Sequence, residues 1–404
     1  MITGNAYPGG FQINEHGARA MGMSGAFTGL ANDASAVYFN PAGITQLSGT
    51  HFMGGATLIA PTNKFDGPTP LTTEWDMKSQ TFFPFNFYAT RQLNENVFIG
   101  LGVNNPFGLG TKWDDNWVGN ELAIDTEVKT YFITPVIAYK FNDMFSISAG
   151  PRFAIADVKI VRAANAGAGE FQTEMNGNTT AWGFAVGALF RPSKQFQVGV
   201  NYQSEVKFDF EGTATSTPKG FNHPLLGVFI PYPNGDITAP LTTPQNITAG
   251  IAVMPNECWT ITADYQYIGW SSYDKLEVDF KNYNSTNPLA PGGSVQSVNR
   301  NYQNTYILRA GAEYKASDVL ALRGGVLYDH NPVEDAYVEP TLPDADRVGI
   351  NVGLGYKLSD KLSVDIAYLL LLFNDRTITN SNFGLNGTYK ASASLVGLDF
   401  SYSL

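Results

Sequence analysis

Residues 348–358 read VGINVGLGYKL, and apolar residues alternate in this stretch with small or polar ones. Every even-numbered position, from Val348 to Leu358, is apolar or aromatic, whereas the odd-numbered positions hold Gly, Asn, Gly, Gly and Lys. Successive side chains of a β-strand point to opposite faces, so the pattern predicts a strand with one apolar face and one small or polar face. The same alternation occurs in residues 259–267, 306–315 and 396–404.

The composition favours a membrane protein built from such strands. Charged residues make up 15% of the chain, against about 25% in an average soluble domain, while aromatic residues make up 13%. The longest apolar stretch, residues 366–373, is far shorter than the ~20 residues that a transmembrane helix needs. Only helices and closed barrels satisfy every backbone hydrogen bond in lipid, so we expect an all-β membrane protein.

The connections between the strands predict a fourteen-stranded antiparallel transmembrane β-barrel. Bacterial barrels combine tight periplasmic turns with long outer loops and an even strand count, whereas a soluble β-sandwich, the alternative, does not need aromatic residues at its strand ends. Short turns are expected at 93–96, 141–143, 191–194, 255–257, 316–318 and 359–361. Long loops are expected at 61–78, 108–126, 164–177, 213–242, 282–300, 331–345 and 374–386.

The first 48 residues do not follow the strand pattern. They are rich in Gly and small residues, and a short helical stretch is expected at 15–23. Their apolar content and the width of a fourteen-stranded barrel favour a hatch, or plug, inside the lumen over a disordered periplasmic arm. We therefore expect a hatch at 1–48 and a barrel at 49–404. No signal peptide is visible, so an export signal is expected to have been removed before this chain begins.

Several functional classes are disfavoured. The net charge of -11 disfavours nucleic acid, and a single cysteine, Cys258, excludes an internal disulfide framework and a Cys-rich metal site. The chain has no GxSxG motif, and its histidines have neither metal-site spacing nor a nucleophile motif. We expect no metal, no cofactor and no enzyme activity, and a hatch would also block a general porin. The four histidines are His16, His51, His223 and His330.

Four stretches resemble the FadL family of outer-membrane transporters for long-chain fatty acids and other hydrophobic compounds. Residues 9–43 resemble the family's hatch, with GFQ near the mature N-terminus and Asn40, Pro41 and Ala42 as the closing Asn-Pro-Ala motif. Residues 105–130 resemble its third outer loop, 202–212 its seventh strand, and 342–356 a late loop-to-strand junction. One departure is the last residue, Leu404, because family members usually end in an aromatic residue.

The resemblance implies passive uptake across the outer membrane of a Gram-negative bacterium. A hydrophobic ligand would bind a groove in the outer loops, pass to a site near the N-terminus of the hatch, and leave sideways where the third strand is kinked. Long-chain fatty acids are the expected ligand, and toluene-like aromatic hydrocarbons are the alternative. We expect a monomer in contact with outer-membrane lipid and lipopolysaccharide, with detergent or lipid able to enter the lumen.

Apolar residues in the loop at 108–126 and just before it are candidates for the groove. Solvent favours polar residues in outer loops, whereas ligand sites are mostly apolar. The alternative is that these side chains pack the loop onto the barrel rim. The groove candidates are Phe107, Leu109, Trp113, Trp117, Val118 and Leu122.

The third strand, residues 97–106, is the candidate lateral opening. Phe98, Gly100 and Gly102 share one face, and Pro106 cannot donate a ladder hydrogen bond. Gly within a strand often marks a bulge or a close approach, and Pro marks broken pairing. The alternative is a plain strand with small lumen residues that face the plug.

A cation in the lumen would help to bind the carboxylate of a fatty acid. By parity, Arg309 and Arg323 point inward, and Arg19 of the hatch could join them, with Phe11 as an apolar contact near the hatch N-terminus. The favoured alternative is that these arginines pair with lumen acids. The acids considered are Glu313 and Asp329.

Overall fold

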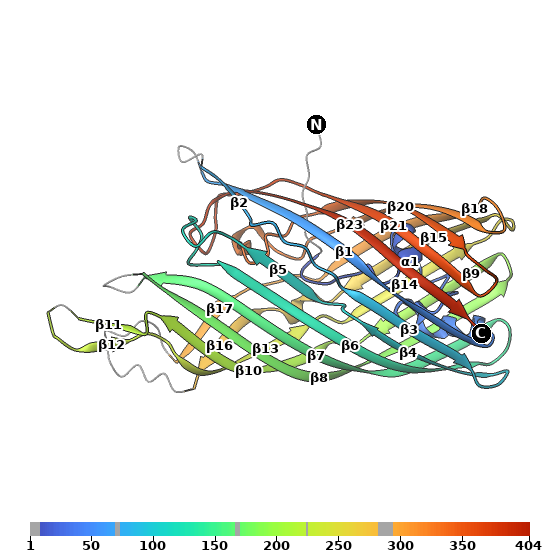
Figure 1. The fold of residues 1–404 in the computed structure, drawn as a ribbon, viewed down its shortest axis with the longest axis horizontal. Coiled ribbons are helices and arrows are strands. Elements are labelled where there is room, and N and C mark those ends of the chain that lie inside the picture. The colour runs from blue at the N-terminus through green and yellow to red at the C-terminus, as the bar shows by residue number, and fades with distance from the viewer. Residues whose placement is uncertain (1–8, 69–72, 166–169, 224, 282–293) are drawn as a thin grey trace.

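The computed structural model describes residues 9–68, 73–165, 170–223, 225–281 and 294–404. These residues form a closed antiparallel barrel of fourteen strands (Figure 1). The barrel closes where β1 pairs with β23, in register from His51 opposite Ser403 to Asp66 opposite Thr388. Sequence-adjacent strands are neighbours throughout the wall, as the turn-and-loop pattern predicts.

Several wall strands consist of two consecutive segments, and two short strands form a separate sheet outside the wall. The wall is built, in order, from β1 (Thr50–Asp66), β3 (Phe85–Gln92), β4 (Val97–Asn104) with β5 (Gly108–Lys112), β6 (Asp125–Lys140), β7 (Phe145–Asn165), β8 (Glu170–Ser193), β9 (Phe196–Gln203) with β10 (Val206–Thr217), β13 (Gly235–Thr243) with β14 (Asn246–Val253), β15 (Trp259–Ile268) with β16 (Lys275–Phe280), β17 (Val295–Asn299) with β18 (Thr305–Lys315), β19 (Leu320–Asp329), β20 (Arg347–Lys357), β21 (Leu362–Phe373) with β22 (Arg376–Ile378), and β23 (Gly387–Ser403). The short strand β2 (Glu74–Asp76) precedes β3 and also pairs with β1 in the wall. The separate sheet consists of β11 (Gly220–Asn222) and β12 (Phe229–Pro231).

The two faces of the strands follow the predicted alternation. In β20, the Val352 side chain is 56% exposed on the outer surface, whereas its neighbour Asn351 is 2% exposed and faces the lumen. The same contrast separates Leu398 from Asp399 in β23. An apolar outer face suits lipid, and the polar lumen face is covered by protein.

All six predicted short turns lie at one end of the barrel, which we call the short-turn end. The other, long-loop end differs from the prediction, because the strands continue into the expected loops. β7 runs to Asn165 and β8 begins at Glu170, so most of the predicted loop 164–177 is a hairpin. β11 and β12 form a further hairpin that projects beyond the barrel (Figure 1). Residues 69–72, 166–169, 224 and 282–293 of the predicted loops lie outside the described ranges.

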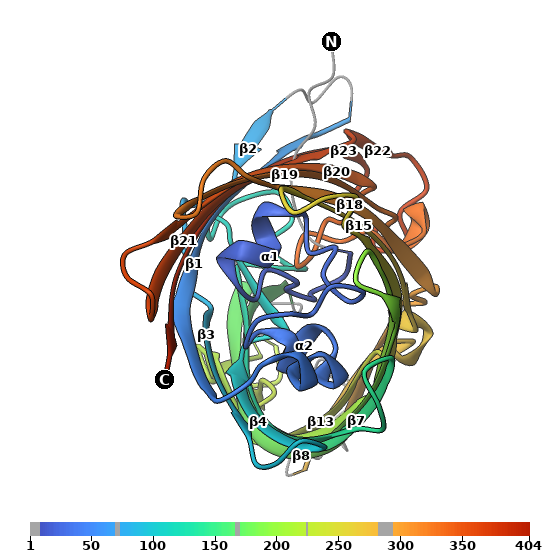
Figure 2. The same ribbon diagram turned by 90° about the vertical axis from the view of Figure 1, so that its right-hand side faces the viewer.

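The N-terminal segment fills the lumen at the short-turn end. It contains α1 (Ala18–Gly22), α2 (Ala36–Phe39) and the 3-10 helix η1 (Pro41–Gln46), and Figure 2 shows α1 and α2 enclosed by the wall. The remaining 3-10 helices are η2 (Trp270–Ser272) and η3 (Asp335–Tyr337). Of the helices in the described ranges, none is long and apolar enough to cross a membrane.

Lumen side chains hold the hatch by its backbone. Asp264 of β15 accepts hydrogen bonds from the N–H groups of Phe27 and Thr28 at 3.1 and 2.9 Å. Asp399 of β23 accepts one from the N–H of Ala18. These carboxylates satisfy hatch donors that have no strand or helix partner, which is the requirement for burying irregular backbone.

The Asn-Pro-Ala motif joins two parts of the hatch to the wall. The Asn40 side-chain amide donates to the carbonyl oxygens of Thr28 and Ala188, both at 3.0 Å, and its Oδ1 accepts from the N–H of Ala42 at 3.2 Å. Pro41 begins η1, where its missing N–H costs nothing. The motif therefore has a structural role in this chain.

Candidate ligand path through the barrel wall

The third wall strand is broken between β4 and β5. β4 is paired with β3 on one side and β6 on the other, and β5 continues the pairing with β6. Between them, Asn105, Pro106 and Phe107 leave the ladder, and the Asn105 side chain takes over two backbone contacts. It donates to the carbonyl oxygen of Thr130 at 2.7 Å and accepts from the N–H of Phe85 at 2.9 Å.

Hatch residues form hydrogen bonds with the backbone groups that lack a strand partner at the break. The N–H of Ile13 donates to the carbonyl oxygen of Pro106, and the N–H of Gly108 donates to the carbonyl oxygen of Phe11, both at 2.9 Å. Gln12 and Phe107 accordingly form an isolated antiparallel bridge. The strand thus turns inward to pair with hatch residues 11–13.

An apolar cavity of about 190 Å³ lies beside this break. Ile13, Ile59 and Leu395 line it from the lumen. Phe83 and Phe85 line it as well, and their side chains are 63% and 39% exposed on the outer surface. Because lumen-facing and outward-facing residues share one cavity, this cavity, which we call the break cavity, is the candidate lateral passage.

The residues predicted to form the opening lie next to it but do not form it. Gly100 and Gly102 belong to the fully paired part of β4. A Cβ atom at Gly100 would lie 2.8 Å from the Val37 side chain, and one at Gly102 would lie 2.9 Å from it. Phe98 is buried in the same cluster. The wall is closed here, because the glycines make room for the hatch rather than for a ligand.

The predicted groove residues separate into two groups. Trp113 and Trp117 stack at 4.3 Å between ring centroids and are 0% and 1% exposed. The Nε1 of Trp113 donates to the carbonyl oxygen of Pro340, so the indoles pack this connection, between the third and fourth wall strands, onto another loop. The Trp117 ring also lies 5.9 Å from that of Phe65 of β1, so the two tryptophans pack the loop onto the barrel rim, as the alternative predicts.

The other groove candidates lie near cavities or solvent. Phe107 and Leu109 line the break cavity, and Leu109 and Leu122 line a second cavity nearer the long-loop end. Val118 is 57% exposed. Phe107 and Leu109 are thus the predicted groove residues that face the candidate passage, and they approach it from inside the barrel.

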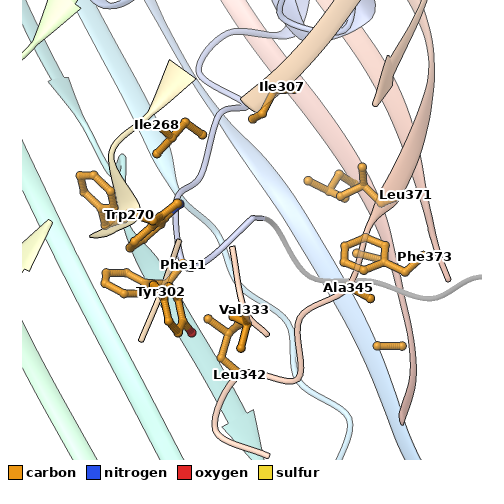
Figure 3. Packing of buried hydrophobic residues seen from close by; sticks show 14 of the residues in the cluster. Phe11, Ile268, Trp270, Tyr302, Ile307, Val333, Leu342, Ala345, Leu371 and Phe373 are labelled. Carbon is orange, nitrogen blue, oxygen red and sulfur yellow. The ribbon is translucent and has the colours of Figure 1, made fainter. Parts of the chain in front are cut away.

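Aromatic rings from distant parts of the chain meet beside the break cavity. The Phe11 ring lies 4.8 Å from that of Trp270 and 6.0 Å from that of Phe107. The Tyr302 ring lies 5.7 Å from that of Trp270, and Figure 3 shows both side chains close to Phe11 of the hatch. Phe132 extends the cluster at 6.0 Å from Phe107. Sequence reasoning identified Phe11 and Phe107 but missed the others, because each belongs to a different strand or loop.

Two of the three predicted arginines are neutralised by lumen acids. Arg19 contacts Glu313 at 3.0 Å and Asp33 at 3.2 Å. Arg323 contacts Glu313 and Asp365, both at 2.6 Å. Pairing with lumen acids, the favoured alternative, is therefore confirmed for these two. Asp329 pairs with Arg347 instead.

Arg309 and a further arginine, Arg152, form no ion pair with the residues that the structure describes. Within the described ranges, Arg309 has no ion pair and lines a small polar cavity of about 30 Å³. Arg152 of β7 is 3% exposed, and among the described residues it has neither an ion pair nor a hydrogen bond. Its guanidinium lies 4.5 Å from the Phe132 ring centroid. Strand parity could have shown that Arg152 faces the lumen, but not that it lacks an acid.

The buried Arg152 guanidinium, which has no acidic partner among the described residues, adjoins an aromatic cluster. Such a site can bind an amphiphile, whose charged head would contact the guanidinium and whose apolar chain would contact the rings. Burying a charge without a partner is costly, whereas a carboxylate would supply both countercharge and hydrogen-bond acceptors. His16 of the hatch lies close to this group, and burial together with the Arg152 charge lowers the His16 pKa to about 3, so its imidazole is neutral. No cluster of His, Cys, Asp or Glu suited to a metal occurs among the residues that the structure describes.

A closed barrel with a folded hatch and an apolar passage toward its wall defines an outer-membrane channel. A family model described as "Outer membrane protein transport protein (OMPP1/FadL/TodX)" matches residues 1–404. The chain belongs to this family, and it is a transport protein of the Gram-negative outer membrane rather than an enzyme.

Individual relatives are similar over the whole chain. The long-chain fatty acid transport protein of Escherichia coli (strain K12) is 26% identical over 443 residues, covering 100% of this chain and 96% of that protein. A Pseudomonas aeruginosa FadL homologue superposes with a TM-score of 0.82 at 21% identity, covering 98% and 99% of the two chains. The Ralstonia pickettii toluene transporter TbuX gives a TM-score of 0.74 at 16% identity, with 97% and 99% covered. These structures share the fold.

Proposed function

We propose that this channel takes up long-chain fatty acids or similar anionic amphiphiles by passive diffusion. The observation that carries the proposal is the buried Arg152 guanidinium, which lacks an acidic partner among the described residues and adjoins the aromatic cluster. A ligand with one carboxylate and an apolar chain would complement both features. The name of the similar Escherichia coli protein supports the same ligand class.

The proposed path ends at the break in the third strand. A ligand enters from the long-loop end, places its carboxylate at Arg152 and its chain against Phe11 and Phe107, and leaves through the break cavity into the outer membrane. The hatch, residues 1–48, stays in place within the barrel, residues 49–404. The continuous cavity lining from Ile13 to Phe83 supports this sideways exit.

The same proposal covers the surroundings of the barrel. The outward-facing apolar residues, such as Val352 and Leu398, suit a monomer surrounded by outer-membrane lipid, with lipopolysaccharide at the long-loop end. Lipid or detergent is a natural occupant of the same lumen site, because it offers the same polar head and apolar chain.

A channel for toluene-like aromatic hydrocarbons is the second candidate. The edge-to-face contacts of Phe11 with Trp270 and Phe107 would suit a flat apolar ring. A neutral aromatic molecule, however, gains nothing from the Arg152 charge. The two candidates therefore predict different consequences of removing that charge.

Binding of oleate and of toluene to purified Arg152→Gln protein distinguishes them. A charge-assisted hydrogen bond contributes about 1.5–3 kcal/mol, so we expect the oleate Kd to rise about 10- to 100-fold and the toluene Kd to stay constant. Arg91→Gln, which removes an exposed arginine near the short-turn end of β3, is the matched control. Unchanged oleate binding in Arg152→Gln would overturn the fatty-acid proposal.

A further inference from the structure

A hairpin at the long-loop end carries an exposed apolar tip. β11 and β12 form a two-stranded antiparallel sheet apart from the wall, and the hairpin extends away from the barrel (Figure 1). At its turn, Leu225 is 90% exposed and Leu226 is 59% exposed. The hairpin tip, as we call this group, consists of Leu225, Leu226, Val228 and Phe229. Solvent favours polar side chains in such a loop, so an exposed apolar group of this kind marks an interaction surface.

Hydrogen bonds give the turn a defined shape. The N–H of His223 donates to the carbonyl oxygen of Val228 at 2.8 Å, and the N–H of Gly227 donates to the carbonyl oxygen of His223 at 2.9 Å. The Nδ1 atom of His223 accepts from the N–H groups of Leu225 and Leu226, both at 3.3 Å. Gly227 has a φ of 64°, which glycine adopts without a steric penalty. The two leucines therefore stand on a preformed turn, and binding through them orders little additional backbone.

The base of the hairpin is fixed to the barrel. The Tyr232 ring is buried and stacks on that of Phe171 of β8, with 3.8 Å between the ring centroids. The backbone N–H of Ser216 donates to the Oδ1 of Asn234 at 2.8 Å, and the Ser216 hydroxyl donates to the carbonyl oxygen of Pro233 at 2.6 Å. The hairpin is thus anchored at its base, and its tip is held away from the barrel.

The charge of the hairpin differs from that of the whole chain. Residues 212–235 contain no Asp or Glu, and Lys219 is their single Lys or Arg, whereas the chain has a net charge of -11. An apolar tip with one nearby cation and no acidic group complements the surface of an anionic lipid bilayer. A protein partner fits less well, because a specific interface buries about 800 Å² on each partner and the tip offers only a few side chains of one turn.

We propose that the hairpin tip docks on an anionic lipid bilayer outside the cell. Leu225 and Leu226 insert among the acyl chains, and Lys219 faces the anionic headgroups. Docking holds an external lipid surface against the long-loop end of the channel. The inference goes beyond the proposed function, because docking requires neither Arg152 nor the break cavity.

The test measures, by flotation, how purified protein in nanodiscs binds to lipid vesicles. One set of vesicles contains equal parts of phosphatidylcholine and phosphatidylglycerol, and the other contains phosphatidylcholine alone. Leu225→Ser and Leu226→Ser should each lower the partition coefficient into anionic vesicles about tenfold, as loss of one inserted leucine side chain predicts. Val118→Ser, which removes an exposed apolar side chain from another outer connection, is the matched control and should bind normally. Lys219→Gln should weaken binding to anionic vesicles by up to about fivefold and leave binding to phosphatidylcholine unchanged.

Arg152→Gln separates this inference from the proposed function, because it should weaken oleate binding and leave vesicle binding unchanged. Lipid docking by the tip is wrong if wild-type protein does not float with anionic vesicles, or if both leucine variants bind them as wild-type protein does. Equal loss of binding in Val118→Ser would also overturn it. Association of wild-type nanodiscs with one another without vesicles, lost in Leu225→Ser, would show instead that the tip joins two copies of the chain. Heat-modifiable migration of each variant checks that the barrel has folded.

Discussion

The backbone N–H of Ile13 lies 2.9 Å from the carbonyl oxygen of Pro106, so a hatch residue pairs with the wall where the third strand is broken. A break in a barrel wall exposes backbone groups that lipid cannot satisfy. Pairing with the hatch satisfies them from inside and leaves the outer side free for apolar residues. The hatch thereby stabilises the candidate passage as well as filling the lumen.

Filling the break cavity should stop uptake without unfolding the barrel. Ala393 of β23 faces the lumen and lines this cavity. In Ala393→Phe the added ring occupies the passage, so oleate uptake should fall to the level of cells without the channel. Ala310→Phe, which places the same ring on the exposed outer face of β18, should transport normally. Normal uptake by folded Ala393→Phe protein would exclude this passage.

Removing the Asn40 side chain should loosen the hatch. The amide makes two hydrogen bonds at 3.0 Å and accepts a third, so Asn40→Ala should cost about 1–3 kcal/mol of local stability. Ion conductance across planar bilayers should rise, because a displaced hatch opens the lumen to water. Ser48→Ala, at an exposed position before β1, is the control. Equal conductance of the two variants would argue against a structural role for Asn40.

A charge on the lipid face should destabilise the barrel more than one in the lumen. Leu354 is exposed on the outer face, and Leu354→Arg should cost ~2–4 kcal/mol if the residue lies near the bilayer midplane. Ser363→Arg places the charge in a polar lumen cavity at the short-turn end and should cost less. Urea unfolding in lipid vesicles measures both values. Equal costs would contradict the assignment of the two faces.

The loop carboxyl of Asp344 should make stability fall as pH rises from about 4 to about 8. Burial raises its pKa to about 8, and its Oδ2 accepts from the N–H of Gly10 at 2.8 Å. Because burial raises the carboxyl pKa from its ordinary value of 3.8 to about 8, the folded state keeps the proton between these two pH values while the unfolded state loses it. The stabilisation is therefore lost progressively as pH rises from about 4 to about 8, and stability changes little above that. Tm should drop more between pH 5 and pH 8 in wild-type protein than in Asp344→Asn. Parallel curves would refute this role.

Much of the barrel could be predicted because lipid on one side imposes a strict period of two. Beyond the lipid-facing band this constraint no longer applies, and there the predicted strand ends were wrong. β7 and β8 extend through residues expected to be loop. In this part of β8 the apolar residues, such as Phe171 and Met175, are buried on the inner face, and the outward residues, such as Glu174 and Asn176, are polar. The alternation therefore has the opposite sense to that of the lipid-facing band, and it does not mark a membrane strand in the sequence.

The site was harder to predict because its parts come from distant segments. Gly100 suggested an opening, yet its small size is explained by Val37 of the hatch. Trp113 looked exposed by its place in a loop, but a carbonyl group in another loop binds its indole. Arg152 was missed because the absence of a partner is a property of the packed lumen and leaves no local pattern.

Locking the hatch to the wall tests the sideways exit most directly. A Cβ atom at Gly397 would lie 3.5 Å from the Cβ of Ala18, which is within disulfide range. In a Cys258→Ser background, the double variant Ala18→Cys/Gly397→Cys should therefore form a disulfide on oxidation. The account predicts equal oleate uptake by oxidised and reduced protein, because the ligand leaves through the wall. Uptake that stops on oxidation and returns on reduction would contradict it and show that the hatch must move.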